Sequence, residues 1–405
     1  MGITVFPAAS GGASYSSQPP ASASSVLLDG QLVTASSITT SVTGTGAPWL
    51  LYANGAGTTT FTVGSDTYNV PAGSTVGTSA YTGSKSVSVA ASLVSTAPTP
   101  FTSSTMPSGS NWTALTYGNG YFVAIAFNSS TGAYSTNGIT WNSSTMPSSS
   151  YWTSVTYGNG YFVAVQRSGT TAGAYSTNGT TWTASTMPSA SQWYGVTYGL
   201  ISSTNYYVAV QGSGTTAGAY STNGTTWTAS TMPSGAGSTN GWQAVTFGNG
   251  YFVAVANATT AGAYSTNGTT WTASTLPSSP SWTAVTYGNG YYVAVAYGTT
   301  GGAYSTNGTS CTASTMPSAS AWYGVTYGNG YFVAVQGSST NVNAYSSNGT
   351  TWTAGTMPNS DTWRNVIYGN GCFVAVQNSG TTDGAYFNTV LPVAYGIYNG
   401  ATVRA

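Results

Sequence analysis

Apolar and polar residues alternate with a period of two in short runs through most of this chain. Four kinds of run follow one another in a fixed order: Trp-Thr-Ala-Val-Thr-Tyr, Tyr-Phe-Val-Ala-Val, Gly-Ala-Tyr-Ser and Thr-Thr-Trp-Thr-Ala-Ser. Such alternation over short runs predicts β-strands. Gly-Asn-Gly separates the first two runs and Asn-Gly the last two, and both supply the positive φ angles that tight hairpins need. The pattern predicts antiparallel units of four strands.

These units recur about forty residues apart, a period that is typical of a β-propeller with one blade per copy. Each copy ends in Met-Pro or Leu-Pro, where proline cannot donate to a strand ladder. This Met-Pro or Leu-Pro punctuation falls at Met106, Met146, Met187, Met232, Leu276, Met316 and Met357. The repeats therefore predict an all-β fold, a seven-bladed β-propeller over residues 100–388.

The ends of the repeat array indicate how the ring closes. The last repeat has three strands, at 363–368, 372–376 and 384–387, and no fourth. The segment 101–107 precedes the first repeat and matches the fourth strand of that repeat nearly letter for letter. We expect residues 101–104 to pair with the last repeat and close the ring. The rival strand, 390–394, contains a proline and no aromatic residue, which argues against it.

Residues outside the array predict two further regions. Residues 1–99 contain apolar runs at 26–33, 49–52, 60–63 and 86–90 between Gly, Pro and Asn turns, and we expect a small β-sandwich-like domain there. Residues 7–24, rich in Ser, Ala and Pro, are typical of an extended arm. The remainder, 389–405, is expected to be a C-terminal tail that docks on the ring.

The composition favours a packed core over disorder. It also contains almost no charged residues. Its 405 residues are 40% hydrophobic and 14% aromatic, which is sufficient for a packed core. Only 2% are charged, with four basic and four acidic residues. Binding to nucleic acid or anionic lipid relies on basic residues, so neither partner is expected. No apolar run is long enough for a membrane helix, and the N-terminus lacks the features of a signal peptide. These features suit an extracellular particle, or export by a non-classical system.

The residues that usually carry catalysis are scarce. The chain has no His and no Glu, so general acid–base chemistry within the propeller would have to use Asp361 and Asp383. No cluster has the residues or spacing of a metal site, and no phosphate loop is recognisable. We expect a protein that is not an enzyme and has no cofactor. Cys311 and Cys372 lie in non-neighbouring repeats and are not expected to pair within one chain, whereas pairing between chains stays open.

The turn between the third and fourth strands resembles a known motif. The segment 175–182, Tyr-Ser-Thr-Asn-Gly-Thr-Thr-Trp, is similar to the Asp-box of sialidase-type propellers, with Asn in place of Asp and one residue fewer between Ser and Gly. It recurs at 134–141, 220–227, 264–271 and 345–352, and in altered form at 304–311. The Asp-box is structural, so this resemblance implies a hairpin and no activity. The repeat as a whole is similar to segments of bacteriophage tail-fibre and other virion proteins, which implies a virion appendage.

Comparison of the repeats with one another predicts where a ligand binds. The first and third turns of each repeat hardly change, whereas the loop between the second and third strands and the connection between repeats vary. Exposed aromatic rings beside polar groups suit sugar recognition. The candidate ligand-binding residues are those that break the repeat on this variable face: Tyr151, Tyr194, Tyr323, Arg167, Asp361, Arg364 and Asp383. The alternatives are that the neighbouring tryptophans pack between blades and that Asp361 and Arg364 form a surface ion pair.

These observations favour one function and leave two others open. We expect a non-enzymatic, oligomeric virion protein, a phage fibre or appendage. Residues 1–99 would anchor it to other virion proteins, and its propeller would attach to a glycan or receptor on the host surface. The alternatives are a purely structural virion or filament subunit and a secreted, lectin-like bacterial adhesin. Host, sugar and copy number lie beyond the sequence.

Overall fold

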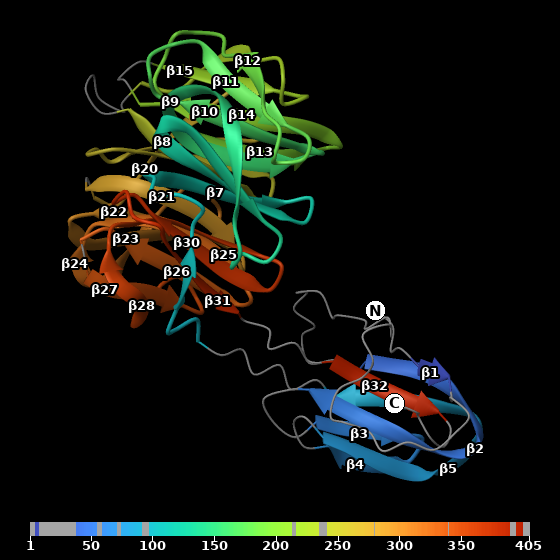
Figure 1. The fold of residues 1–405 in the computed structure, drawn as a ribbon. Helices are drawn as coiled ribbons and strands as arrows, with labels where there is room; N and C mark the ends of the chain where they lie inside the picture. Colours follow the sequence, from blue (N-terminus) through green and yellow to red (C-terminus); the bar gives the residue numbers. More distant parts are fainter. Residues whose placement is uncertain are drawn as a thin grey trace. The chain divides into compact units, whose positions relative to one another are not determined.

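The chain folds into two compact units, which are described separately. The computed structural model describes residues 5–7, 38–54, 59–70, 74–90, 97–212, 216–234, 241–278, 280–338, 340–388 and 394–399. The propeller unit is Thr96–Asn388, and the terminal unit combines Met1–Ser95 with Thr389–Ala405. Figure 1 labels the strands of both units. Among the described residues, no helix has the length and apolar character required to cross a membrane.

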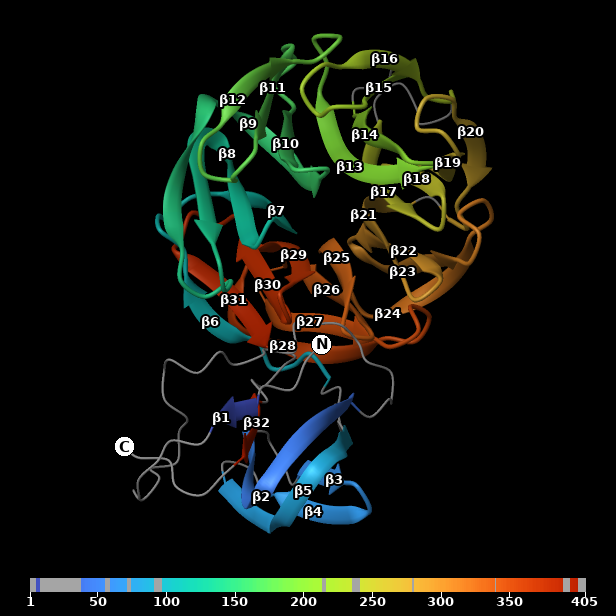
Figure 2. The same ribbon diagram turned by 90° about the vertical axis from the view of Figure 1, so that its right-hand side faces the viewer.

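The propeller unit is an all-β propeller whose sheets surround a common centre, as Figure 2 shows. One sheet has six strands, in the order β12-β11-β10-β9-β8-β7. Its strands are β7 (Trp112–Gly118), β8 (Tyr121–Ser135), β9 (Asn142–Gly158), β10 (Tyr161–Gln166), β11 (Ala172–Ser176) and β12 (Thr183–Thr186). The other sheets of this unit have four strands each.

The four-stranded sheets follow the order of the repeats. The third repeat forms β13 (Trp193–Ile201), β14 (Thr204–Gln211), β15 (Ala217–Ser221) and β16 (Thr228–Thr231). The fourth forms β17 (Trp242–Gly248), β18 (Tyr251–Ala256), β19 (Ala261–Ser265) and β20 (Thr272–Thr275). The fifth forms β21 (Ser281–Gly288), β22 (Tyr291–Tyr297), β23 (Thr299–Ser305) and β24 (Thr312–Ser320). The sixth forms β25 (Trp322–Gly328), β26 (Tyr331–Gln336), β27 (Thr340–Ser346) and β28 (Thr353–Asp361).

The last sheet joins the two ends of the repeat array. It contains β29 (Trp363–Gly369), β30 (Cys372–Gln377), β31 (Asp383–Asn388) and, from before the first repeat, β6 (Thr102–Thr105). Strand β6 pairs antiparallel with β31, from Thr102 opposite Tyr386 to Thr105 opposite Asp383. This is the closing pairing that the repeat count predicts.

Counted by hydrogen-bonded sheets, the propeller has six blades and not the seven that the sequence predicts. Strand β9 causes the difference because it runs without a break from the first repeat into the second. Its residues Asn142 to Thr145, Ser150 and Tyr151 pair with β8, and those from Trp152 to Gly158 pair with β10. The connection between the first two repeats thus stays extended and hydrogen-bonded, so these repeats share one six-stranded sheet.

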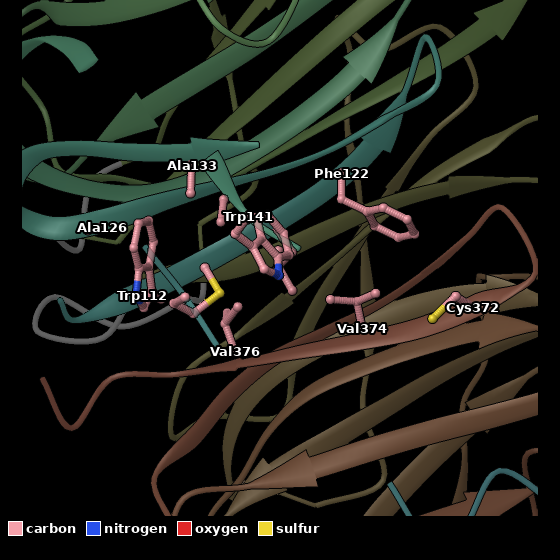
Figure 3. Packing of buried hydrophobic residues seen from close by; sticks show 11 residues of the cluster. Trp112, Phe122, Ala126, Ala133, Trp141, Cys372, Val374 and Val376 are labelled. Carbon is pink, nitrogen blue, oxygen red and sulfur yellow. The ribbon is translucent and has the colours of Figure 1, made fainter. Parts of the chain in front are cut away.

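The core lies between neighbouring sheets. One tryptophan per repeat, near the start of its innermost strand, is fully buried: Trp112, Trp152, Trp193, Trp242, Trp282, Trp322 and Trp363. In the cluster drawn in Figure 3, Val376 of β30 lies beside Trp112 of the first repeat, and Val374 lies opposite Phe122 of the same repeat. Replacing so buried a tryptophan by alanine typically costs about 3–5 kcal/mol of stability. These tryptophans pack between repeats, as the alternative interpretation of the sequence holds.

Two local features explain why the repeat keeps its glycines and asparagines. A Cβ on Gly158, which ends the first strand of its repeat, would lie 2.0 Å from the ring of Tyr198 in the next repeat. In the third turn, Ser176 Oγ accepts from the Gly179 amide at 2.9 Å. Asn178 Oδ1 accepts from the amides of Thr180 and Thr181, both at 2.9 Å. A neutral amide oxygen therefore holds this turn.

The described strands of the terminal unit form one six-stranded sheet, in the order β1-β32-β2-β5-β3-β4. They are β1 (Val5–Pro7), β2 (Ile38–Asn54), β3 (Thr59–Val63), β4 (Asp66–Val70), β5 (Ser74–Ala90) and β32 (Ala394–Asn399). The predicted sandwich is thus corrected to a single sheet among these strands. The described part of the expected tail is β32, which pairs with β2 and β1 in this sheet. Most of the predicted arm, the run at 26–33 and residues 389–393 lie outside the described residues.

Candidate functional site

A cavity of about 360 Å³ lies at the centre of the propeller unit, and residues from all seven repeats line it. We call it the axial cavity. Figure 2 shows the innermost strands β7, β13, β17, β21, β25 and β29 arranged around this centre. The residue that follows the buried tryptophan lines the cavity in each repeat: Thr113, Thr153, Tyr194, Gln243, Thr283, Tyr323 and Arg364.

A β-bulge places each of these residues. The pairing between the first and second strands shifts at the residue after the tryptophan, so that Trp193 lies opposite Gln211 while Gly195 lies opposite Val210. The same shift brackets Tyr323 and Arg364. A bulge leaves one residue unpaired and turns its side chain, and here that side chain enters the axial cavity.

Threonine at this position serves the scaffold. Thr153 Oγ1 donates to the carbonyl of Trp193 at 2.7 Å, and Thr283 Oγ1 donates to that of Trp322 at 2.6 Å. Each bond joins one innermost strand to the next. Tyr194, Gln243, Tyr323 and Arg364 replace this threonine in the other four repeats. Their longer side chains are the ones that give the cavity its chemistry.

Glycine follows both of the tyrosines at this position. A Cβ on Gly195 would lie 3.3 Å from Ala244 Cα, and one on Gly324 would lie 3.0 Å from Asn365 Cα. These are very tight approaches to the backbone of the next innermost strand. The Tyr-Gly pairs thus combine a large side chain in the cavity with close packing of neighbouring strands.

A second variable position supplies the other large groups. It is the residue directly after the six-residue second-strand run, such as Tyr-Phe-Val-Ala-Val-Gln, where the repeats carry Phe127, Arg167, Gly212, Asn257, Tyr297, Gly337 and Asn378. Phe127, Arg167 and Asn378 line the axial cavity. Tyr297 is 50% exposed, and its ring lies 5.6 Å from that of Tyr323.

Both arginines of the propeller unit lie against aromatic rings in this cavity. Arg167 Nη1 donates to Tyr194 Oη at 3.0 Å, and the guanidinium carbon lies 4.6 Å from the centre of the Phe127 ring. The guanidinium carbon of Arg364 lies 3.9 Å from the centre of the Tyr323 ring. Burial lowers the pKa of Arg364, and the positive charge of Arg167 lowers it further. The two cations are therefore close enough to repel one another.

The sequence-predicted site residues fall into two groups. Tyr194, Tyr323, Arg167 and Arg364 line the axial cavity together. Tyr151 is 41% exposed and stacks on Phe127, with ring centres 4.8 Å apart. It therefore adjoins the same cavity from the solvent side.

Asp361 and Asp383 form a separate group and do not line the cavity. Thr381 Oγ1 lies 3.3 Å from Asp361 Oδ2 and 3.1 Å from Asp383 Oδ2, and its one proton serves one carboxylate at a time. The Thr362 amide donates to Asp361 Oδ1 at 2.6 Å. The alternative of an Asp361–Arg364 ion pair is wrong for the residues described, because Arg364 stacks on Tyr323. Among the residues that the structure describes, no group of three or more His, Cys, Asp or Glu side chains could hold a metal ion.

The interpretation of the sequence missed Phe127, Gln243 and Tyr297. All three stand at the two variable positions, after the tryptophan and after the second strand. The signal was present in the repeats themselves, because aligning them position by position isolates these columns. What the alignment lacked was the bulge, which turns the first column toward the axis.

Comparisons with known proteins show the fold. No family model and no curated protein sequence matches the chain. Virginiamycin B lyase from Staphylococcus aureus has a similar structure, with a TM-score of 0.62 at 11% identity, covering 71% of this chain and 99% of that one. YCF48 from Cyanidioschyzon merolae gives 0.54 at 13% identity, with 71% and 98% covered. The Cps50 (Swd1) β-propeller domain of Myceliophteria thermophila gives 0.55 at 8% identity, with 71% and 99% covered.

These comparisons correct one prediction and give no support to another. The prediction that the protein is not an enzyme is wrong as an exclusion, because virginiamycin B lyase is an enzyme with a similar fold. At such low identity the likeness shows the fold alone, so no activity is carried over. The comparisons give no support to the resemblance to phage tail fibres or to Asp-box propellers.

Proposed function

We propose that the propeller unit binds a saccharide in its axial cavity and serves as the host-attachment module of an extracellular particle. One observation carries the proposal: aromatic rings and hydrogen-bonding side chains converge from all seven repeats on a single cavity of about 360 Å³. Cavities of several hundred cubic ångströms, largely preformed and holding a few polar groups, are typical of small-molecule sites.

The two exposed rings extend this site outward. The ring of Tyr151 stacks on that of Phe127, and the ring of Tyr297 packs beside that of Tyr323. Aromatic faces pack against the CH groups of a sugar ring, while polar groups nearby bond its hydroxyls. A chain of several sugars would therefore place one unit in the cavity and rest its neighbours on the exposed rings.

The setting of this module is also a proposal. A chain with only 2% charged residues is little affected by salt outside the cavity. A particle that works outside cells fits this property and the repeats that resemble virion proteins. In this proposal residues 1–99 bind other virion proteins, and several copies display their propellers to the host surface.

A glycan array probed with the full-length protein tests the attachment function. We expect binding to a restricted group of glycans, and we expect Tyr297→Ala to weaken it several-fold through the loss of ring stacking. Leu200→Ala is the matched control, because Leu200 is 54% exposed, apolar and absent from the cavity lining. The eluted glycans should be checked for cleavage, since a related fold supports an enzyme. Absence of binding across the array would overturn the proposal.

A further inference from the structure

Both basic residues of the propeller unit line the same cavity. The whole protein has four lysines and arginines, and the 293 residues of the propeller unit, Thr96–Asn388, contain only Arg167 and Arg364. These two belong to different repeats, the second and the seventh, yet both line the axial cavity. Arginines retained for solubility would be spread over the outer surface.

Neither arginine has an acidic partner among the residues that the structure describes. The contacts of Arg167 are the Tyr194 hydroxyl and the rings of Phe127 and Tyr194. Arg364 lies over Tyr323. The two aspartates of the propeller unit are engaged with Thr381 and its neighbourhood and do not line the cavity. The cavity therefore holds two positive charges and no carboxylate.

Such an arrangement is unfavourable without a negative partner. Removing a cation from water costs free energy unless a counter-charge or hydrogen bonds replace the lost hydration. Burial and the positive charge of Arg167 both lower the pKa of Arg364, and the contact with Tyr323 offsets them only in part. The aromatic rings cover a face of each guanidinium, which leaves N–H donors at the edges. Those edges match the planar or tetrahedral oxygens of a carboxylate or a sulfate.

Arg167 is also held in place before any ligand arrives. The buried Gln166 donates through Nε2 to Thr170 Oγ1 at 2.8 Å, and its Oε1 accepts from the Ser168 amide. These bonds fix the loop that begins with Arg167. A preorganised cation loses little conformational entropy on binding.

We propose that the saccharide of the axial cavity is acidic, and that Arg167 and Arg364 bind its carboxylate or sulfate group between them. This inference rests on the proposed saccharide attachment and adds the class of sugar. The aromatic and hydroxyl groups around the arginines favour a sugar over the C-terminal carboxylate of a peptide, which becomes an outcome of the test.

Calorimetric titration of the full-length protein tests the inference with matched ligands. The probes are trigalacturonate and its methyl ester, a sulfated galactose oligosaccharide and its desulfated form, a short peptide with a free C-terminal carboxylate, and inorganic sulfate. We expect an acidic oligosaccharide to bind at least tenfold more tightly than its neutral counterpart. The preferred acid identifies the group as carboxylate or sulfate. Because the charge lies in the ligand, this comparison requires no folded variant. Binding should weaken as NaCl rises.

Substitutions of the two arginines test whether they cause the preference for acidic saccharides. Arg364→Gln and Arg167→Gln should each weaken acidic-saccharide binding by about ten- to a hundredfold, the range expected for hydrogen bonds to a charged group. Arg364→Lys should recover part of the loss, because it keeps the charge without the planar group. Lys85→Gln removes the same charge from β5 of the terminal unit and should change nothing.

Each contrary outcome has a distinct meaning. Equal binding of acidic and neutral sugars, unaffected by either arginine variant, would overturn the inference and leave saccharide attachment standing. Inorganic sulfate bound as tightly as the sulfated sugar would reduce the site to one for a simple anion. A peptide carboxylate bound in preference to every sugar, or no sugar bound at all, would overturn the attachment function together with the inference.

Discussion

At the scale of single residues, the position after the buried tryptophan decides whether a repeat contributes to scaffold or to site. Thr153 at this position bonds the next innermost strand. Arg364 at the same position stacks on Tyr323 and faces the cavity. One bulge geometry therefore supports both roles, and substitution of a single residue switches a repeat between them. A family of such chains could change ligands through these columns without altering the fold.

Burial gives the two free cysteines a residue-scale prediction. It raises the pKa of Cys311 to about 11 and that of Cys372 to about 12, from an ordinary value of 9.0. Above pH 9 the thiols ionise in the unfolded chain before they do so in the folded one. The contribution of these two thiols to the stability of the fold is therefore fully present below pH 9 and is lost as pH rises toward 12.

Denaturant unfolding at pH 8 and pH 10 checks this, and Cys372→Ala should show a smaller loss between the two. In the folded protein at pH 8.5, we expect iodoacetamide to modify the buried Cys372 more slowly than Cys311. Equal and rapid labelling of both residues in the folded state would show that the burial of Cys372 is wrong.

At the scale of elements, the loops of the variable face are held by glutamines at the ends of second strands. Gln377 Nε2 donates to the Thr381 carbonyl at 2.6 Å, and Gln336 makes the corresponding bond to Thr340 Oγ1. The loop after Gln166 differs from these because it begins with an arginine. The same pair of hydrogen bonds thus orders a loop without a charged residue in one repeat and a loop with a cavity-lining arginine in another.

This pairing of loops allows a controlled test of positioning. Gln166→Ala should weaken binding of an acidic oligosaccharide several-fold, because the loop that carries Arg167 loses its support. Gln336→Ala removes an equivalent brace beside Gly337 and should lower stability by a similar amount, about 1–3 kcal/mol for the lost hydrogen bonds, without weakening binding. Calorimetric affinities and denaturant unfolding of both variants provide the comparison. Equal affinities would show that Gln166 only stabilises the fold.

The limits of sequence-based prediction are clearest at this scale. Strand order and hairpin turns follow from period-two runs and Gly/Asn turns, since those patterns are local, and the closing strand follows from counting the strands of the repeats. The merging of the first two repeats was not predictable, because it depends on whether Ser150 and Tyr151 of β9 pair with β8. The site was predicted in part: Tyr194 and Arg364 break the repeat visibly. The alternative of an ion pair shows why the rest was not, because sequence proximity of Asp361 and Arg364 says nothing about the bulge at Arg364.

At the scale of the whole molecule, one short strand carries the closure of the propeller. Strand β6 comes from before the first repeat and completes the last sheet. Phe101, just before β6, is buried in the cluster that includes Trp363 and Met357. Its ring centre lies 6.1 Å from that of Phe387, and its amide donates to the Thr356 carbonyl at 2.9 Å. The segment that closes the ring is also the one that leads from the terminal unit. If its short pairing with β31 is lost, the ring opens.

The chain provides its own control for the closing contact. Phe101 occupies the position that Trp182 holds in the second repeat, and both are buried. Phe101→Ala and Trp182→Ala should each cost about 3–5 kcal/mol. Trp182 lies inside the array, so its loss should affect only adjacent strands. Loss of Phe101 should release β6 and raise hydrogen exchange along β31, which then becomes an unpaired edge. Hydrogen–deuterium exchange with peptide resolution separates the cases: unchanged protection of β31 in Phe101→Ala would mean that the ring is closed by backbone pairing alone.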